Sequence, residues 1–263
     1  MRHAAAAASC VALVALLAAA SASAGIGVRA SAGLGYVSYG DFNDFVAHLD
    51  DVVLAANGAS GTISSMHWVG EFGGEITAPL VPMLDLGIGF GIIRGSSDFT
   101  FSAGGDRFDY KHTVTAYPVT ATAYAKLPLV PFAKPYAFAG VGVYYANASF
   151  DEEGTSGGSS SGFSAELTKW GFGLHGGAGL SFALVPRASL DLGVKGRWAK
   201  IRGLRGTATA TDGAKTDVFL AYYKDADGAP QFGPESTADA AKYGEGSVDL
   251  SGVAFTLTLR VVF

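Results

Sequence analysis

The sequence predicts an all-β fold, an antiparallel up-and-down transmembrane β-barrel of eight strands with a short helix in its first extracellular loop. Only 16% of the 263 residues are charged, whereas about a quarter are charged in a typical soluble domain. Beyond residue 24, no stretch approaches the roughly 20 consecutive apolar residues that a spanning helix needs. Lipid offers the backbone no hydrogen bonds, so a membrane protein without spanning helices has to be a closed barrel.

Residues 1–24 are predicted to be a cleaved signal peptide and residues 25–263 the barrel domain. A basic start precedes an apolar run at 4–20 and the small-residue cleavage site Ala22-Ser23-Ala24. A retained membrane anchor is the alternative, which the short length and the small residues disfavour. Cys10 is the only cysteine and leaves with the signal, so the mature chain has no thiol chemistry.

The charge balance limits the partners of the mature chain. Once Arg2 is removed, 17 basic and 23 acidic residues remain, and no basic run stands out. This argues against nucleic acid as a partner. A soluble lipocalin-like barrel is also disfavoured, because the charged residues are too few to solvate its outer surface.

Eight segments of alternating hydrophobicity follow the signal peptide, as in membrane barrels. Three connections are short and contain proline, which breaks a strand ladder; they lie at 78–82, 127–131 and 183–186. Four longer connections alternate with them, so we expect the short turns and both termini at the periplasmic end. The segments lie at about 26–40, 62–78, 83–101, 107–127, 135–150, 166–184, 188–202 and 247–263.

The third segment shows the two faces of a predicted strand. One face carries Asp85 and three glycines, and the other carries Leu84, Leu86, Ile88, Phe90 and Ile92. Arg94 follows on the apolar face, about 25 Å along a strand tilted by about 40°, and is therefore expected at the outer membrane interface. Inward glycines suit a barrel that is too narrow for large side chains.

Ionisable residues of both signs lie on the predicted inward faces. A buried charge needs a partner, and eight strands leave an interior just wide enough for side chains. A paired network that fills the lumen is the simplest interpretation, but a narrow polar pore would use the same residues, and both stay open. The set comprises Arg29, Glu71, Glu75, Lys126, Asp191, Lys195, Arg197 and Arg260.

The first long loop is predicted to contain a helix with Asp41 as its N-cap and Asn57-Gly58 at its end. We expect it to rest as a cap on the neighbouring loops, because an amphipathic helix only shows that one face is covered. A lid over the barrel mouth, or a contact with a partner or lipid head group, is the alternative. The apolar face comprises Phe42, Phe45, Val46, Leu49, Val52 and Val53.

The last long loop, at about 203–246, contains two strand-like arms around Asp212-Gly213, a hairpin turn signal. The first arm, 207–211, is too short to cross a membrane. We therefore expect an extracellular hairpin and eight barrel strands, with ten strands as the alternative. The Gly/Ser-rich residues 154–162 are expected to form a mobile loop.

Catalysis and cofactor binding are not expected. Ser65, His67 and Glu71 share one face of the second segment and superficially resemble the His, Ser and acid of lipid A deacylases. However, the order is Ser-x-His, and the face points into the lumen, where a substrate has no access. The four mature histidines lie on separate elements, so their spacing predicts no metal site.

The C-terminal residues resemble the last strand of outer-membrane proteins, whose terminal aromatic and alternating apolar residues are read by the barrel-assembly machinery. With the signal peptide and the turns, the mature chain resembles the eight-stranded outer-membrane barrel families typified by OmpW, OmpX and the OmpA transmembrane domain. The resemblance implies the outer membrane of a Gram-negative-type bacterium, with outer-membrane lipid and lipopolysaccharide as partners. The matching residues are Phe255, Leu257, Leu259, Val261 and Phe263.

Two functions compete at this point. A non-enzymatic surface or envelope-structural role is favoured by a lumen filled with paired charges. An OmpW-like channel for small or hydrophobic molecules would be favoured by a continuous apolar cavity under the loop helix, lined for example by Phe42, Phe45, Phe219 and Tyr222. The sequence slightly favours the first role, and a lipid-modifying barrel enzyme is a minor alternative.

Overall fold

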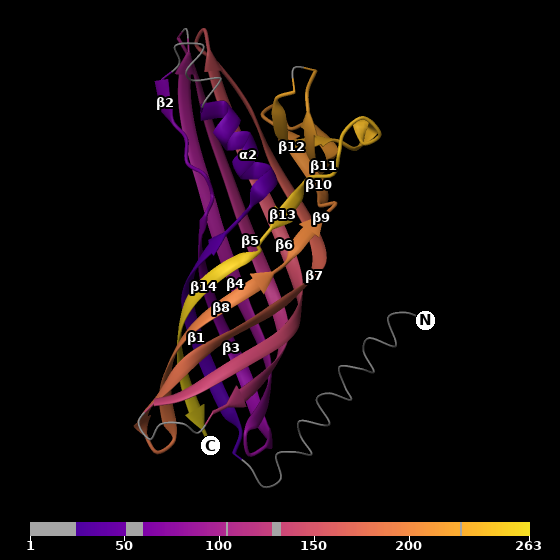
Figure 1. Ribbon diagram of the computed structural model, residues 1–263. Helices are drawn as coiled ribbons and strands as arrows, with labels where there is room; N and C mark the ends of the chain where they lie inside the picture. The colour runs from indigo at the N-terminus through magenta and orange to yellow at the C-terminus, as the bar shows by residue number, and fades with distance from the viewer. Residues whose placement is uncertain (1–24, 51–59, 104, 128–132, 227) are drawn as a thin grey trace.

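The computed structural model describes residues 25–50, 60–103, 105–127, 133–226 and 228–263. Eight strands close into one antiparallel ring (Figure 1), which confirms the predicted up-and-down barrel. Among the described residues, no helix is both long and apolar enough to cross a membrane. In ring order, the strands are β1 (Gly27–Val37), β3 (Trp68–Val81), β4 (Leu84–Ala103), β5 (Asp106–Lys126), β6 (Ala133–Ser156), β7 (Ser159–Val185), β8 (Ala188–Trp198) and β14 (Gly252–Val262).

The apolar outer surface follows from the two-residue period of each strand. On β14, Phe255, Leu257 and Leu259 face outward, whereas Thr256, Thr258 and Arg260 alternate with them on the inner face. Tyrosine and tryptophan side chains cluster on the outer face near the long loops, where such residues mark a membrane interface. Two of these clusters are Tyr36 with Trp68 and Tyr117 with Tyr145 and Trp170.

Tight turns join the strands at the end opposite the long loops, where the C-terminus also lies (Figure 1). Pro82-Met83 joins β3 to β4, and Pro186-Arg187 joins β7 to β8. The expected turn at 127–131 lies mostly outside the described residues. The predicted alternation of short turns and long connections is therefore observed at these two turns, at the end that is periplasmic in outer-membrane barrels.

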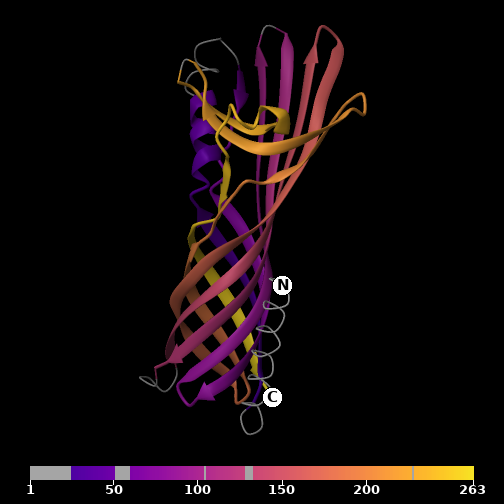
Figure 2. The ribbon, with the colours of Figure 1, turned by 90° about the vertical axis from the view of Figure 1, so that its right-hand side faces the viewer.

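Strands β4 to β7 continue well beyond the ring and form an extracellular sheet (Figure 2). The lower part of β7 pairs with β8, and its upper part, residues 163–168, pairs with β10 (Arg205–Ala210). The added strands are β10, β11 (Lys215–Lys224) and β12 (Pro230–Ser236) in the same sheet, β2 (Ser60–Thr62) on β4, and the separate pair β9 (Lys200–Arg202) and β13 (Ser247–Asp249).

The inner face changes character above the aromatic clusters. Below them it carries charged residues, whereas above them it carries a tightly packed apolar cluster that includes Val114, Ala148, Phe150 and Leu167. Helix α2 (Gly40–His48) lies inside this extracellular part, with its apolar face against the cluster. We call this set the apolar plug; it also contains Val37, Tyr39, Phe42, Val46, Met66, Val69, Ile93, Ala116, Tyr144, Ala146, Ala165, Ala199, Ile201, Leu204, Val218, Leu220, Phe232, Val248 and Leu250.

The helix differs from the prediction at its N-terminal end, and its predicted C-terminal end lies outside the described residues. It begins at Gly40 with Tyr39 at the N-cap position, so the prediction of Asp41 as N-cap was wrong. The Asp41 carboxylate instead accepts hydrogen bonds from the backbone N–H (2.9 Å) and hydroxyl (2.5 Å) of Ser247, a tertiary contact that helix propensity cannot predict. Phe42 and Val46 are buried, Phe45 and Leu49 are half-buried, and Val52, Val53 and Asn57-Gly58 lie outside the described residues.

Two predictions for the extracellular part had opposite outcomes. The hairpin at Asp212-Gly213 is confirmed, since β10 and β11 pair on either side of it and Gly213 has a φ of 84°. The expected loop at 154–162 was wrong, because β6 and β7 run through it and turn at Gly157-Gly158, where both φ values are positive. The pairing of β6 with β7 continues without a break from the apolar part of these strands. The segment is therefore a hairpin end, although its Gly/Ser-rich composition by itself favours a flexible loop.

We expect the stability of the plug to depend on pH through His112, which lies on β5 beyond Tyr117 and thus outside the membrane. Its Nδ1–H donates to the Ser149 carbonyl (3.0 Å), and its Nε2 accepts from the Tyr39 hydroxyl (2.6 Å). Burial lowers the pKa of His112 to about 3. The unfolded chain gains a proton below about pH 6.5, so stability should fall with pH from there toward pH 3, by about 2 kcal/mol at pH 5.

Denaturant unfolding in lipid vesicles at pH 7 and pH 5 measures this loss. His112→Gln keeps groups that can donate and accept hydrogen bonds but cannot gain a proton in this range, and should flatten the pH dependence. His48→Gln, on α2, should retain it. An unchanged pH dependence in His112→Gln would show that His112 is not buried as a neutral group.

Candidate functional site in the barrel lumen

All eight ionisable residues singled out in the sequence point into the lumen, where they pair in three layers along the barrel axis. The layer nearest the periplasmic end centres on Asp85 of β4, which is 1% exposed. Its carboxylate pairs with Lys126 (2.6 Å) and Arg260 (2.9 Å). The sequence places Asp85 on the inward face, but we did not predict it as a member of the charge network. Its position as an acidic residue among inward glycines could have indicated that it needs a cationic partner.

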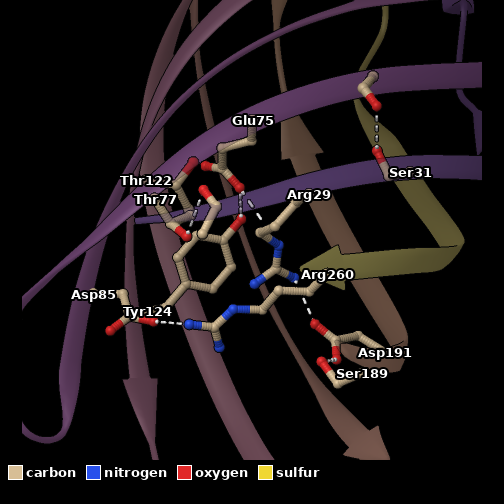
Figure 3. Close-up of polar contacts among 12 residues, drawn as sticks. Arg29, Ser31, Glu75, Thr77, Asp85, Thr122, Tyr124, Ser189, Asp191 and Arg260 are labelled. Carbon is tan, nitrogen blue, oxygen red and sulfur yellow. Dashed lines mark hydrogen bonds and ion pairs between the residues drawn. The ribbon is translucent and has the colours of Figure 1, made fainter. Parts of the chain in front are cut away.

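The middle layer is built around Arg29 of β1 (Figure 3). Its guanidinium pairs with Asp191 (3.1 Å) and Glu75 (3.6 Å) and lies over the Tyr124 ring, 4.2 Å from the centroid. The Tyr124 hydroxyl donates to Glu75 at 2.5 Å. A second ring, Tyr136, flanks the same guanidinium at 5.6 Å. Both tyrosines are functional neighbours that the sequence analysis missed, because charge pattern alone does not reveal which aromatic residue will face a cation.

The upper layer joins Glu71 of β3 to two cations of β8. Glu71 pairs with Arg197 at 2.5 Å and with Lys195, across the barrel from its own strand. Arg197 also donates from Nε to the Leu250 carbonyl (2.7 Å). His175 lies in the same part of the lumen and contacts the Thr122 hydroxyl through Nε2 at 3.1 Å.

The middle and upper layers form a charge-neutral set. Arg29, Lys195 and Arg197 balance Glu71, Glu75 and Asp191. Unpaired buried charges are costly, so such a set is tolerated only when the partners satisfy one another. The alternation of polar and apolar residues along the strands predicts that each of these residues faces inward. Which cation pairs with which anion depends on the register between strands, and the sequence does not reveal that register.

Two cavities lie between these side chains in the described part of the lumen. The larger has a volume of about 130 Å³ and lies among the middle and upper layers, and the smaller, of about 50 Å³, lies toward the periplasmic end. Arg29, Tyr124 and Tyr136 line both cavities and therefore separate them. Above the larger cavity, the apolar plug begins with Val69, Ile93 and Tyr144.

The residues considered for catalysis do not come together. Ser65 and His67 precede β3 rather than lying on it, which corrects their placement on one strand face. Ser65 is exposed, His67 stacks on Tyr36 at 4.9 Å, and Glu71 is engaged by Lys195 and Arg197. Among the described residues, no group of three or more His, Cys, Asp or Glu side chains could hold a metal ion.

Comparison with known proteins agrees with this architecture. The sequence matches the family described as "Outer membrane protein beta-barrel domain" over residues 6–222. The chain belongs to this family. No curated protein sequence matches it.

Several solved structures are similar to this barrel. A major outer membrane protein from Thermus thermophilus is 14% identical, with 90% of this chain and 99% of that chain covered and a TM-score of 0.47. The outer membrane protease OmpT from Escherichia coli is 9% identical, with 91% and 96% covered and a TM-score of 0.42. Neisserial surface protein A is 17% identical, with 90% and 97% covered and a TM-score of 0.36. Similarity at these levels says nothing about activity.

Removing the Glu71 carboxylate should destabilise the barrel strongly. Glu71→Gln would leave Lys195 and Arg197 buried without their anion, and breaking a buried pair in this way costs about 3–5 kcal/mol. Urea unfolding of the protein in lipid vesicles measures the change. Glu153→Gln on the extracellular part of β6 is the matched control and should change stability by less than about 0.5 kcal/mol. Equal effects of the two substitutions would contradict the paired network.

Proposed function

We propose that this protein is a closed, non-enzymatic outer-membrane barrel with an envelope-structural role, which presents its extracellular sheet to the surroundings. The apolar plug carries the proposal, because it occupies the space through which a solute would have to leave the lumen on the extracellular side. Phe42 of α2 and Phe150 of β6 are both 0% exposed within it. A packed interior of this kind leaves few voids larger than a water molecule.

The charged layers support closure from below. Each of the six central charges has its partner within the lumen, so a migrating ion would have to compete with pairs that are already formed. An eight-stranded ring encloses only enough space for side chains. The channel alternative calls for an apolar cavity under the helix, whereas Phe42 is packed into the plug there and Tyr222 packs against it.

The outer face of the extracellular sheet supports the surface part of the proposal. Strand register aligns a polar row across β4, β5, β6, β7 and β10: Asp98, Lys111, Asp151, Ser164 and Thr209. Two concavities of about 540 and 650 Å³ adjoin this row and share its last three residues. The chain thus builds a broad, continuous polar surface outside the ring, which suits contact with the surroundings.

A lipid-modifying activity is not part of the proposal. Nucleophilic catalysis needs a nucleophile within hydrogen-bond reach of an oriented base. Ser65 is exposed to solvent, and His67 stacks on Tyr36 instead of orienting a nucleophile. The carboxylates in the lumen are all paired with cations.

Single-channel recording in planar lipid bilayers tests the proposal. The folded mature protein should give no conductance steps, whereas an open porin reconstituted in the same way should conduct. Phe42→Asp places a charge in the plug and should disrupt its packing. It should still give no conductance steps, because the charge pairs in the lumen below remain formed. Reproducible steps in the unaltered protein that change with Lys195→Met or Arg197→Met would overturn the proposal and establish a channel.

A further inference from the structure

The larger lumen cavity has an uneven wall. The strands β5 to β8 and β14 contribute mainly polar and aromatic side chains to it. The strands β1 and β3 also contribute polar side chains, but between these, and on β4, inward glycines leave patches of nearly bare backbone. The glycines are Gly33, Gly73, Gly89 and Gly91. The missing side chains keep open a chamber of about 130 Å³, roughly tenfold more than the 10–15 Å³ that one water needs.

Several neutral hydroxyl groups line this chamber and have no hydrogen-bond partner among the described residues. Tyr144 is 2% exposed, and its hydroxyl has no hydrogen-bond partner among the described residues. The hydroxyls of Thr120 and Thr258 line the same chamber and are likewise unpartnered within the described part of the chain. Tyr144 and Thr258 are buried and Thr120 is half-buried. Buried polar groups are nearly always hydrogen-bonded, so these hydroxyls favour a bound species that both donates and accepts.

The charges around the chamber define what that species can carry. The chamber is lined by three cations and two anions, and a third anion, Asp191, pairs with Arg29 from the smaller cavity. Each of these charges therefore already has a partner, and none remains for a ligand to neutralise. A charged ligand would lose its hydration without gaining a free counter-ion. An uncharged ligand with several hydroxyls meets both conditions.

The route to the chamber lies at the periplasmic end. The smaller cavity is lined by Lys126 and Lys134, which reach the surface there, and only Arg29 and the two tyrosines stand between the cavities. The plug closes the opposite side. Crossing this partition means displacing Arg29 from its two carboxylate partners, whereas crossing the plug means displacing a whole packed apolar cluster. An uncharged solute that does not exchange with these ion pairs therefore meets the smaller obstacle at the periplasmic side.

We propose that the lumen chamber is a binding site for a small uncharged polyol that enters from the periplasmic side. The site binds through Tyr144, Thr120 and Thr258, against the glycine wall of β1, β3 and β4. This site is independent of the proposed envelope role, because a barrel closed to the outside can still bind a solute from within, and a conducting barrel could lack the site.

Saturation-transfer NMR on the folded protein in nanodiscs with deuterated lipid tests the proposal, with glycerol as the probe. Glycerol should receive saturation from the unaltered protein, whereas acetate and methylammonium, which are smaller but charged, should receive much less. Thr120→Leu fills the chamber and should abolish the transfer. Thr115→Leu, on the outer face of the same strand, is the matched control and should leave it unchanged.

Tyr144→Phe provides a second variant that removes one hydroxyl without changing the packing. It should weaken glycerol binding about fivefold, the effect of one hydrogen bond. No transfer to glycerol would show that the chamber holds water alone and would overturn the proposal. Stronger transfer to acetate or methylammonium would overturn the ligand class, and unchanged transfer in Thr120→Leu would place the binding elsewhere.

Discussion

The structure depends on one constraint: four of its strands pass from lipid into water without interruption, so the apolar face of each strand has to change sides on the way. Within the ring, apolar side chains face outward to lipid and charged ones face inward. Beyond the aromatic clusters, the same strands carry Val114, Phe150 and Leu167 on the inner face. Apolar surface has to leave water in both regions, and the boundary between them is where the membrane ends.

This change of sides determines the rest of the interior. The extracellular sheet needs something to bury its inner face, and α2 with β12 supplies it through Phe42 and Phe232. The lumen below receives the charges that cannot face lipid, and these are stable only as pairs. A packed apolar upper end and a hydroxyl-lined chamber below it are both consequences of the same arrangement.

The sequence predicted the barrel well because alternation, proline turns and hairpin glycines are local signals. The inward position of Asp191, the outward position of Phe255 and the hairpin at Asp212-Gly213 all follow from a period of two or from turn chemistry. The plug was not predicted. Residues such as Val114 and Leu167 resemble ordinary strand positions in the sequence, and only the register and the length of β4 to β7 show that they lie in one row on the inner face.

The candidate site was predicted residue by residue but not as an arrangement. The inward faces indicated the ionisable residues, whereas the pairing of Glu71 with Arg197 joins strands that are far apart in the sequence. Tyr144 was missed for a related reason, since an inward tyrosine has no distinguishing pattern until its neighbours are known. Asp41 shows the converse, a good local N-cap signal overridden by a tertiary bond to Ser247.

The most direct test compares the oxidation of two methionines by hydrogen peroxide in the lipid-embedded protein. Met66 lies in the plug and is 2% exposed, whereas Met83 lies in the periplasmic turn and is 49% exposed. Methionine oxidation follows access to the oxidant, so Met83 should form sulfoxide at least about tenfold faster than Met66 when each is followed by peptide mass spectrometry. Equal rates at the two residues would show that the plug admits water, and would contradict a barrel closed on its extracellular side.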